Sequence, residues 1–202
     1  MVLGFRVWLE AISDVRLRGF QYIWANLAFV VCSLPLLTLP AAFAALMHTV
    51  YRIQTSPQGA EMSDFLDTFR AQLWRALPWG LAYAGFFALN AANLWSYGAA
   101  QGPVAGTLRA LWLSGGFVAL NLLLYTWPFY FEMAQPSLLG ATRNALVLLL
   151  HNPGFSLSLL IGCLLIIGLS SLLSALWVLL SFAALASVAN SAVQNRLAAR
   201  AA

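Results

Sequence analysis

Residues 154–195 read GFSLSLLIGCLLIIGLSSLLSALWVLLSFAALASVANSAVQN, and this run contains no charged side chain. As one helix, at about 1.5 Å per residue, it would be about twice as long as the apolar layer of a bilayer. We therefore predict two membrane spans here, over residues 155–170 and 173–194, with a break near residues 168–171. The fold class that follows is an all-α, polytopic transmembrane helical bundle.

The composition of the rest of the chain agrees with this prediction. The chain is 62% hydrophobic and only 8% charged, whereas an average soluble domain has roughly 25% charged residues. We predict six spans in a single integral membrane domain over residues 1–202, and the other four cover residues 19–38, 41–53, 77–97 and 108–131. The segment 41–53 falls short of the ~20 residues that a bilayer requires. We therefore expect the turn between Pro35 and Pro40 to dip into the membrane.

The arginines predict the topology of these spans. Nine of the ten lie before the first span, from the end of the second to the start of the third, between the fourth and fifth, or after the last, and only Arg109, at the start of the fourth, lies on the other side. Basic residues in short loops stay in the cytoplasm. Both termini are therefore expected to be cytoplasmic. The basic residues form no run suited to nucleic acid, and we expect the lipid bilayer, with its anionic headgroups, to be their partner.

Three short amphipathic helices are predicted on the cytoplasmic side. The first has an apolar face of Phe5, Trp8, Leu9 and Ile12. The second covers residues 63–76 with Ser63 as its N-cap, and the third lies within residues 135–152. Three arginines of the second and third helices are candidate contacts for a cytoplasmic partner, namely Arg70, Arg75 and Arg143.

No group of residues points to catalysis. His48 and His151 have no second histidine or carboxylate three or four residues away, which metal binding on a helix would favour. Ser114-Gly115-Gly116 lacks the motif that surrounds a nucleophilic serine. We expect no enzyme activity, no cofactor and no metal.

Amides inside the predicted spans are the remaining polar candidates. Four of them form either contacts between helices or a polar path across the membrane: Asn26, Asn90, Asn93 and Asn121. Intramembrane amides are usually partners in hydrogen bonds between helices. The path is the sharper alternative. A proton-coupled transporter is disfavoured, because the predicted spans hold no mid-membrane carboxylate or basic residue.

Three blocks of the sequence resemble a known family. Residues 26–46 (NLAFVVCSLPLLTLPAAFAAL), 64–70 (DFLDTFR) and 144–153 (NALVLLLHNP) are similar in order and spacing to blocks of the YesL family, although Leu39 stands where a glycine is common. The resemblance implies a multi-helix protein of the bacterial inner membrane, encoded near carbohydrate uptake systems of the ABC type. It implies no established activity and no catalytic residues.

Two functions remain open from the sequence. The favoured one is a non-enzymatic accessory or assembly factor that associates with subunits of a carbohydrate ABC transporter. The alternative is a small permease or channel for a neutral polar solute, lined by the asparagines. Self-association is left open.

Overall fold

The computed structural model describes residues 2–201, with side chains described from residue 4 to residue 199. The described chain is mostly helical and contains no strand, which confirms the predicted all-α class. The helices are α1 (Val2–Leu17), α2 (Gly19–Ser33), η1 (Leu36–Thr38), α3 (Leu39–Thr55), α4 (Met62–Gln72), α5 (Ala76–Ser96), α6 (Pro103–Glu132), α7 (Leu138–His151), α8 (Pro153–Leu172), η2 (Trp177–Ser181) and α9 (Phe182–Ala201).

Helix α3 lies at the centre of the molecule and packs against α2, α4, α5, α6 and α9. Its first half is rich in alanine, and Ala41, Ala42, Ala44 and Ala45 are all buried. Small side chains let neighbouring helix backbones approach closely, which is the usual way in which membrane helices pack. Larger side chains such as Leu46 fill the spaces that remain.

The start of α3 differs from the prediction. Pro40 stands in the first turn of the helix, where its missing N–H group would have had no partner within the helix. The helix therefore begins at Leu39 and continues to Thr55, and together with η1 it forms an apolar segment of 20 residues, Leu36–Thr55. Our expectation of a segment too short to cross a membrane is thus wrong.

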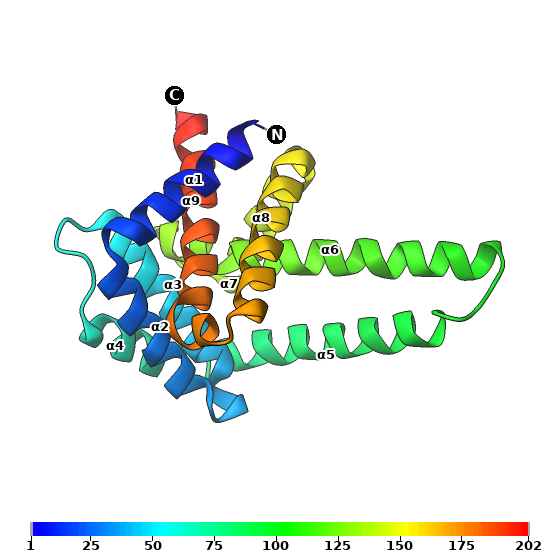
Figure 1. The fold of residues 1–202 in the computed structure, drawn as a ribbon, viewed down its shortest axis with the longest axis horizontal. Coiled ribbons are helices and arrows are strands. Elements are labelled where there is room, and N and C mark those ends of the chain that lie inside the picture. Colours follow the sequence, from blue (N-terminus) through cyan, green and yellow to red (C-terminus); the bar gives the residue numbers. More distant parts are fainter. Residues whose placement is uncertain (1, 202) are drawn as a thin grey trace.

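The N-terminal helix belongs to the helical bundle, and both ends of the described chain lie close together (Figure 1). α1 packs on α9 and α8, with Val7 and Ala11 buried in the contact. The apolar face that we predicted for α1 is largely not the face that packs on the bundle, and its residues Phe5 and Leu9 remain exposed. Our sequence prediction missed the buried face because it is composed of small side chains.

The second surface helix begins earlier than predicted. Its N-cap is Glu61, whose side chain accepts from the third helical residue, while the Asp64 carboxylate accepts from the Glu61 N–H at 2.9 Å. This reciprocal arrangement satisfies two backbone donors that a helix start leaves free, so the prediction of Ser63 as the cap is wrong. In the third surface helix, α7, Ser137 is the N-cap and accepts from Gly140.

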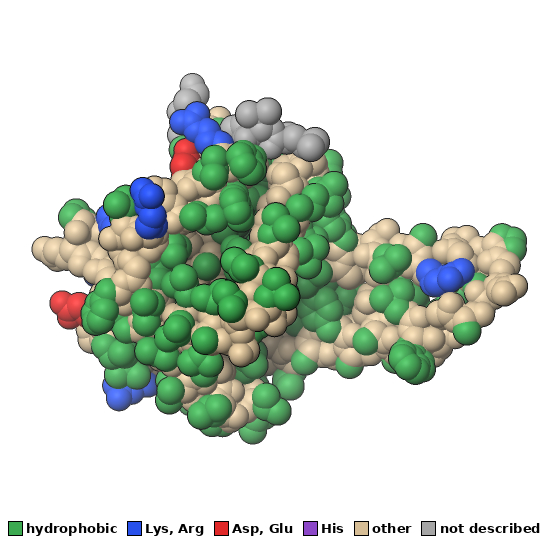
Figure 2. Space-filling view, viewed as in Figure 1, with side chains coloured by type: hydrophobic (Ala, Val, Ile, Leu, Met, Phe, Trp, Pro, Cys, Tyr) green, Lys and Arg blue, Asp and Glu red, His purple; other side chains and the backbone are tan. Residues whose placement is uncertain are grey.

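Helices α5 and α6 form a long hairpin that extends away from the remaining helices (Figure 1). α6 continues as one helix through Pro128. Few side chains of the hairpin are buried over most of its length, and exposed apolar residues such as Leu81, Leu89, Leu111 and Leu113 line it. In the space-filling view, hydrophobic side chains cover both the bundle and the hairpin (Figure 2). Such a surface requires an apolar environment.

The charge-free run does form two helices, but the break lies later than predicted. α8 continues to Leu172, and the chain turns between residues 173 and 176. The returning helix begins with five residues in π-helical geometry, η2, before α9 continues to the end of the described chain. A π-helix bonds residue i to residue i+5, which is rare and leaves room for groups from outside the helix.

Four segments of the described chain are long and apolar enough to cross a membrane, namely Leu36–Thr55, Pro103–Glu132, Pro153–Leu172 and Trp177–Ala199. They confirm a membrane protein built from helices. α2 is 15 residues long, and α5 includes Asn90 and Asn93, which lower its mean hydropathy. Six crossings with cytoplasmic termini therefore stay a prediction.

Candidate functional site

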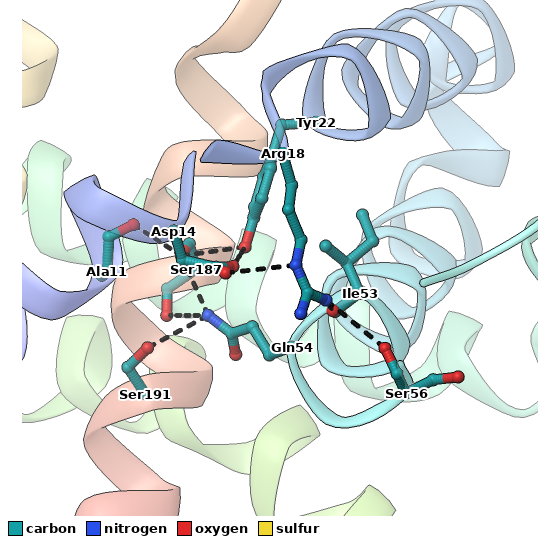
Figure 3. Close-up of polar contacts among 9 residues, drawn as sticks. All are labelled: Ala11, Asp14, Arg18, Tyr22, Ile53, Gln54, Ser56, Ser187 and Ser191. Atoms are coloured by element: carbon teal, nitrogen blue, oxygen red, sulfur yellow. Dashed lines mark hydrogen bonds and ion pairs between the residues drawn. The ribbon is translucent and has the colours of Figure 1, made fainter. Parts of the chain in front are cut away.

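The most extensive polar cluster lies where α1, α2, α3 and α9 meet (Figure 3). The Tyr22 hydroxyl donates to the Asp14 carboxylate and lies 3.4 Å from the Ser187 hydroxyl. The Gln54 amide nitrogen donates to the carbonyl and hydroxyl oxygens of Ser187, at 3.2 and 2.9 Å, and to the Ser191 hydroxyl at 3.0 Å. Each of the four helices contributes at least one side chain, so the cluster fixes their relative positions.

Arg18 extends this cluster to the end of α3. Its guanidinium donates to the carbonyl oxygens of Ile53 and Ser56, the latter at 3.4 Å, and lies 3.6 Å from the Asp14 carboxylate. The last carbonyl groups of a helix have no partner within the helix and carry partial negative charge. Arg18 therefore stabilises the C-terminus of α3 and ties it to the connection between α1 and α2.

The sequence analysis did not identify this cluster. Asp14 and Arg18 are four residues apart, as are Arg18 and Tyr22, and on a helix side chains at this spacing are neighbours. That spacing could have predicted a contact among these three side chains. Their partners Gln54 and Ser187, however, lie far along the chain, and no local pattern links them.

Asn26, a predicted candidate, is fully hydrogen-bonded to the π-helical segment. Its amide nitrogen donates to the carbonyl oxygens of Trp177 at 2.9 Å and Val178 at 2.6 Å. Its carbonyl oxygen accepts from the N–H of Ala183 at 2.9 Å. The side chain thus satisfies backbone groups that the change from π-helix to α-helix leaves free.

The other three candidate asparagines lie on the α5–α6 hairpin and do not bond to one another. Asn90 donates to the Trp112 carbonyl at 2.7 Å and links the two helices. Asn93 and Asn121 donate to the carbonyls of Leu89 and Phe117, four residues earlier in their own helices. Each amide therefore has a backbone partner, and the structure brings no pair of them together.

His48 lies at the contact between α3 and α4. Its Nδ1 atom is 2.7 Å from the Thr68 hydroxyl, and its ring packs 4.8 Å from the Phe131 ring centroid. Nearby, Arg52 of α3 forms an ion pair of 3.8 Å with Asp64 of α4. Among the described residues no group of three or more histidine, cysteine or acidic side chains could hold a metal ion. The contacts of His48 with Thr68 and Phe131 give it a packing and hydrogen-bonding role.

The three candidate arginines are all exposed. Arg70, on α4, lies 3.9 Å from the Asp67 carboxylate, and both side chains are more than three-quarters exposed, so the pair contributes little to stability. Arg75 stands just before α5, and Arg143 is on α7. Gln72 and Arg75 line the same cavity as Leu138 at the start of α7.

Apolar cavities flank the base of the hairpin. One of them, about 430 Å³, lies between the turn at residues 36–40 and α5, and its walls include Leu36, Phe43, Trp79 and Phe87. A second cavity, about 400 Å³, lies between α5 and α6 beside Phe86 and Val118. Their walls offer contact area to apolar groups and few polar groups that could orient a substrate.

The comparisons with known proteins concern mainly α2 to α5. A family model described as "Protein of unknown function, DUF624" matches residues 22–94, which is less than half of the chain. No curated protein and no solved structure matches the chain. The matched residues include Asn26, Gln54 and His48 with its partner Thr68, so the segment resembling this family of unknown function contains the central helix α3 and its polar contacts.

Proposed function

We propose that this protein is a non-enzymatic accessory or assembly factor of the bacterial inner membrane, associated with carbohydrate uptake of the ABC type. The resemblance to YesL proteins supports this proposal, and the segment of residues 22–94 overlaps the first two of the three blocks that carry the resemblance. Four segments of the described chain are long and apolar enough to cross a membrane. A role in binding or assembly requires an exposed surface that a partner protein can contact. The short helices α4 and α7 carry exposed arginines that could form such a surface.

The observation that carries the proposal is the set of exposed arginines around the base of the hairpin. Arg70, Arg75 and Arg143 belong to short segments that connect the long helices. Exposed arginines are well suited to pairing with carboxylates on a partner, because the planar guanidinium can bind both oxygens at once. We infer that this surface faces the cytoplasm and contacts an acidic patch on a transporter subunit.

The contacts of the buried amides favour assembly over transport. Asn26, Asn90 and Asn121 each donate to a backbone carbonyl, and Asn26 and Asn90 thereby join two helices. A polar path would need such groups to face a common water-filled space. Their use in helix contacts supports a protein that presents a fixed surface to a partner.

Affinity capture from native membranes tests this proposal. The tagged protein is expected to recover a carbohydrate transporter subunit, and replacing Arg70, Arg75 and Arg143 together by alanine should reduce the recovery at least several-fold. Arg109→Ala is the matched control, because it removes an arginine at the far end of the hairpin. Deletion of the gene should slow growth on a complex carbohydrate.

The permease alternative makes a different prediction in the same system. If the purified protein alone moves a neutral sugar into liposomes, and Asn90→Ala or Asn121→Ala abolishes that transport, the accessory function is contradicted. If capture recovers the transporter subunit equally well with the triple variant, the arginine surface is not its binding site.

A further inference from the structure

A polar cavity at the base of the hairpin is distinct from the clusters described above. Its volume is about 460 Å³, and its walls are Gln72, Arg75, Tyr130, Pro136 and Leu138. These residues come from the end of α4, the connection before α5, the last turn of α6, the connection after it and the start of α7. Five separate segments therefore converge on one space, as in a cleft that can take a ligand.

The polar groups of this cavity are incompletely paired. Gln72 is only 6% exposed, and its amide nitrogen donates to the Tyr130 hydroxyl at 3.3 Å. The Gln72 carbonyl oxygen has no hydrogen-bond partner within the described residues. A buried polar atom without a partner is costly, and it often marks a place where another molecule supplies the missing group. This oxygen requires a donor.

Arg75 and Tyr130 offer the complementary chemistry. In the described part of the chain Arg75 forms no ion pair, and its side chain is exposed at the edge of the cavity. The Tyr130 hydroxyl accepts from Gln72, which leaves its own hydrogen free to donate. A guanidinium and a hydroxyl that both donate into one space are suited to the oxygens of a phosphate group.

The position of the cavity fits the surface of a membrane. Arg75 directly precedes α5, and Tyr130 is two residues from the end of α6, so the cavity lies where both helices of the hairpin end, opposite its tip. Trp74, beside Arg75, is 77% exposed. Tryptophan at the end of an apolar helix typically lies at the level of the lipid headgroups. Arg75 would then stand at the level of the headgroup phosphates.

We propose that this cavity binds the phosphate group of a phospholipid whose headgroup also carries a hydrogen-bond donor, as the hydroxyls of phosphatidylglycerol do. Arg75 and Tyr130 bind the phosphate oxygens, and the Gln72 carbonyl accepts from the headgroup hydroxyl. Phosphatidylcholine supplies the phosphate but no donor, since its quaternary nitrogen carries no hydrogen. The proposal goes beyond the accessory function and does not depend on it.

Native mass spectrometry and thermal unfolding of the full chain in detergent test the site. Because charge-assisted hydrogen bonds contribute to binding, we expect phosphatidylglycerol to bind about tenfold more tightly than phosphatidylcholine. Arg75→Gln and Tyr130→Phe should each weaken binding of phosphatidylglycerol severalfold. Gln72→Met should reduce the preference between the two lipids to the part that the net negative charge of phosphatidylglycerol contributes. Arg16→Gln is the matched control, because it removes an exposed arginine on α1, and it should leave binding unchanged.

Three results would overturn the proposal. Equal affinity of the wild-type protein for the two lipids would exclude a role for the headgroup donor. Equal losses of affinity for phosphatidylglycerol in Arg75→Gln and Arg16→Gln would show that only the net charge of the protein matters. The Tyr130→Phe variant retains the ring and guards against a loss caused by misfolding. Full competition by glycerol 3-phosphate at similar concentration would overturn the lipid as the source and assign the phosphate to a soluble ester.

Discussion

At the scale of single residues, buried amide side chains act mainly through backbone groups. Asn26 binds three of them at the π-helical segment, and Asn190 of α9 donates to the Met47 carbonyl of α3 at 3.1 Å. In an apolar environment an unpaired backbone group cannot form a hydrogen bond with water instead. An asparagine that supplies such partners from a neighbouring helix therefore joins the two helices and permits irregular backbone between them.

The first prediction concerns Asn26. Asn26→Ala leaves two carbonyl groups and one N–H of the segment 177–183 without their side-chain partner, so it should destabilise the fold by about 1–3 kcal/mol. Asn93→Ala is the matched control, since Asn93 bonds only within its own helix, and it should cost less than about 0.5 kcal/mol. Thermal unfolding of both variants in detergent measures the difference. Equal effects would show that the Asn26 contacts do not stabilise the fold.

At the scale of elements, close approach between the turn at residues 35–40 and α5 depends on one glycine. A Cβ atom on Gly80 would lie 2.1 Å from Cγ of Pro40, whereas a Cβ atom on Gly85, one turn further along α5, would meet nothing within 4 Å. Gly80 therefore lets the proline ring at the start of α3 rest directly on the α5 backbone. This contact attaches the hairpin to the central helix.

The second prediction uses these two glycines as a matched pair. Gly80→Ala should destabilise the protein by about 1–3 kcal/mol, because the added methyl group forces α5 away from Pro40. Gly85→Ala should be neutral or stabilising by up to about 1 kcal/mol, because alanine is the better helix former and the position is open. The unfolding temperatures of the two variants, measured in the same detergent, test this difference in stability. A Gly80→Ala variant as stable as Gly85→Ala would contradict the close contact.

At the scale of the whole molecule, the ends of the described chain and the tip of the hairpin lie far apart (Figure 1). Arg6 and Arg196 lie on the helices at the two ends, α1 and α9, whereas Arg109 is on α6 near the hairpin tip. This separation motivates a direct test of topology.

The third prediction is the topology itself. Reporter fusions after residues 58, 138 and 202 should behave as cytoplasmic, and a fusion after residue 102 should behave as external, because basic loops resist translocation. Accessibility of single introduced cysteines to an impermeant reagent provides an independent measurement at the same positions. A C-terminus labelled from outside would rule out an even number of crossings with a cytoplasmic N-terminus.

The sequence by itself determined the class of the protein and most of its helices. Long apolar runs and scarce charges leave few alternatives to membrane helices, because only a helix satisfies its own backbone groups in lipid. Pro40 and the polar residues of 56–61 also marked the ends of helices, since their effects are local. The predictions failed by a few residues where a cap or a proline allowed two positions, as at Ser63 and Glu61.

Only the tertiary structure decided which polar side chains meet. Gln54 and Ser187, or Asn26 and Ala183, are separated by more than a hundred residues, and their contact depends on how whole helices pack. Apolar helices of similar composition have no pattern that selects a neighbour, because lipid and protein are equally apolar around them. The cavity at Gln72 and Arg75 has the same origin. Its five segments are individually unremarkable in sequence, and packing alone places them around one space.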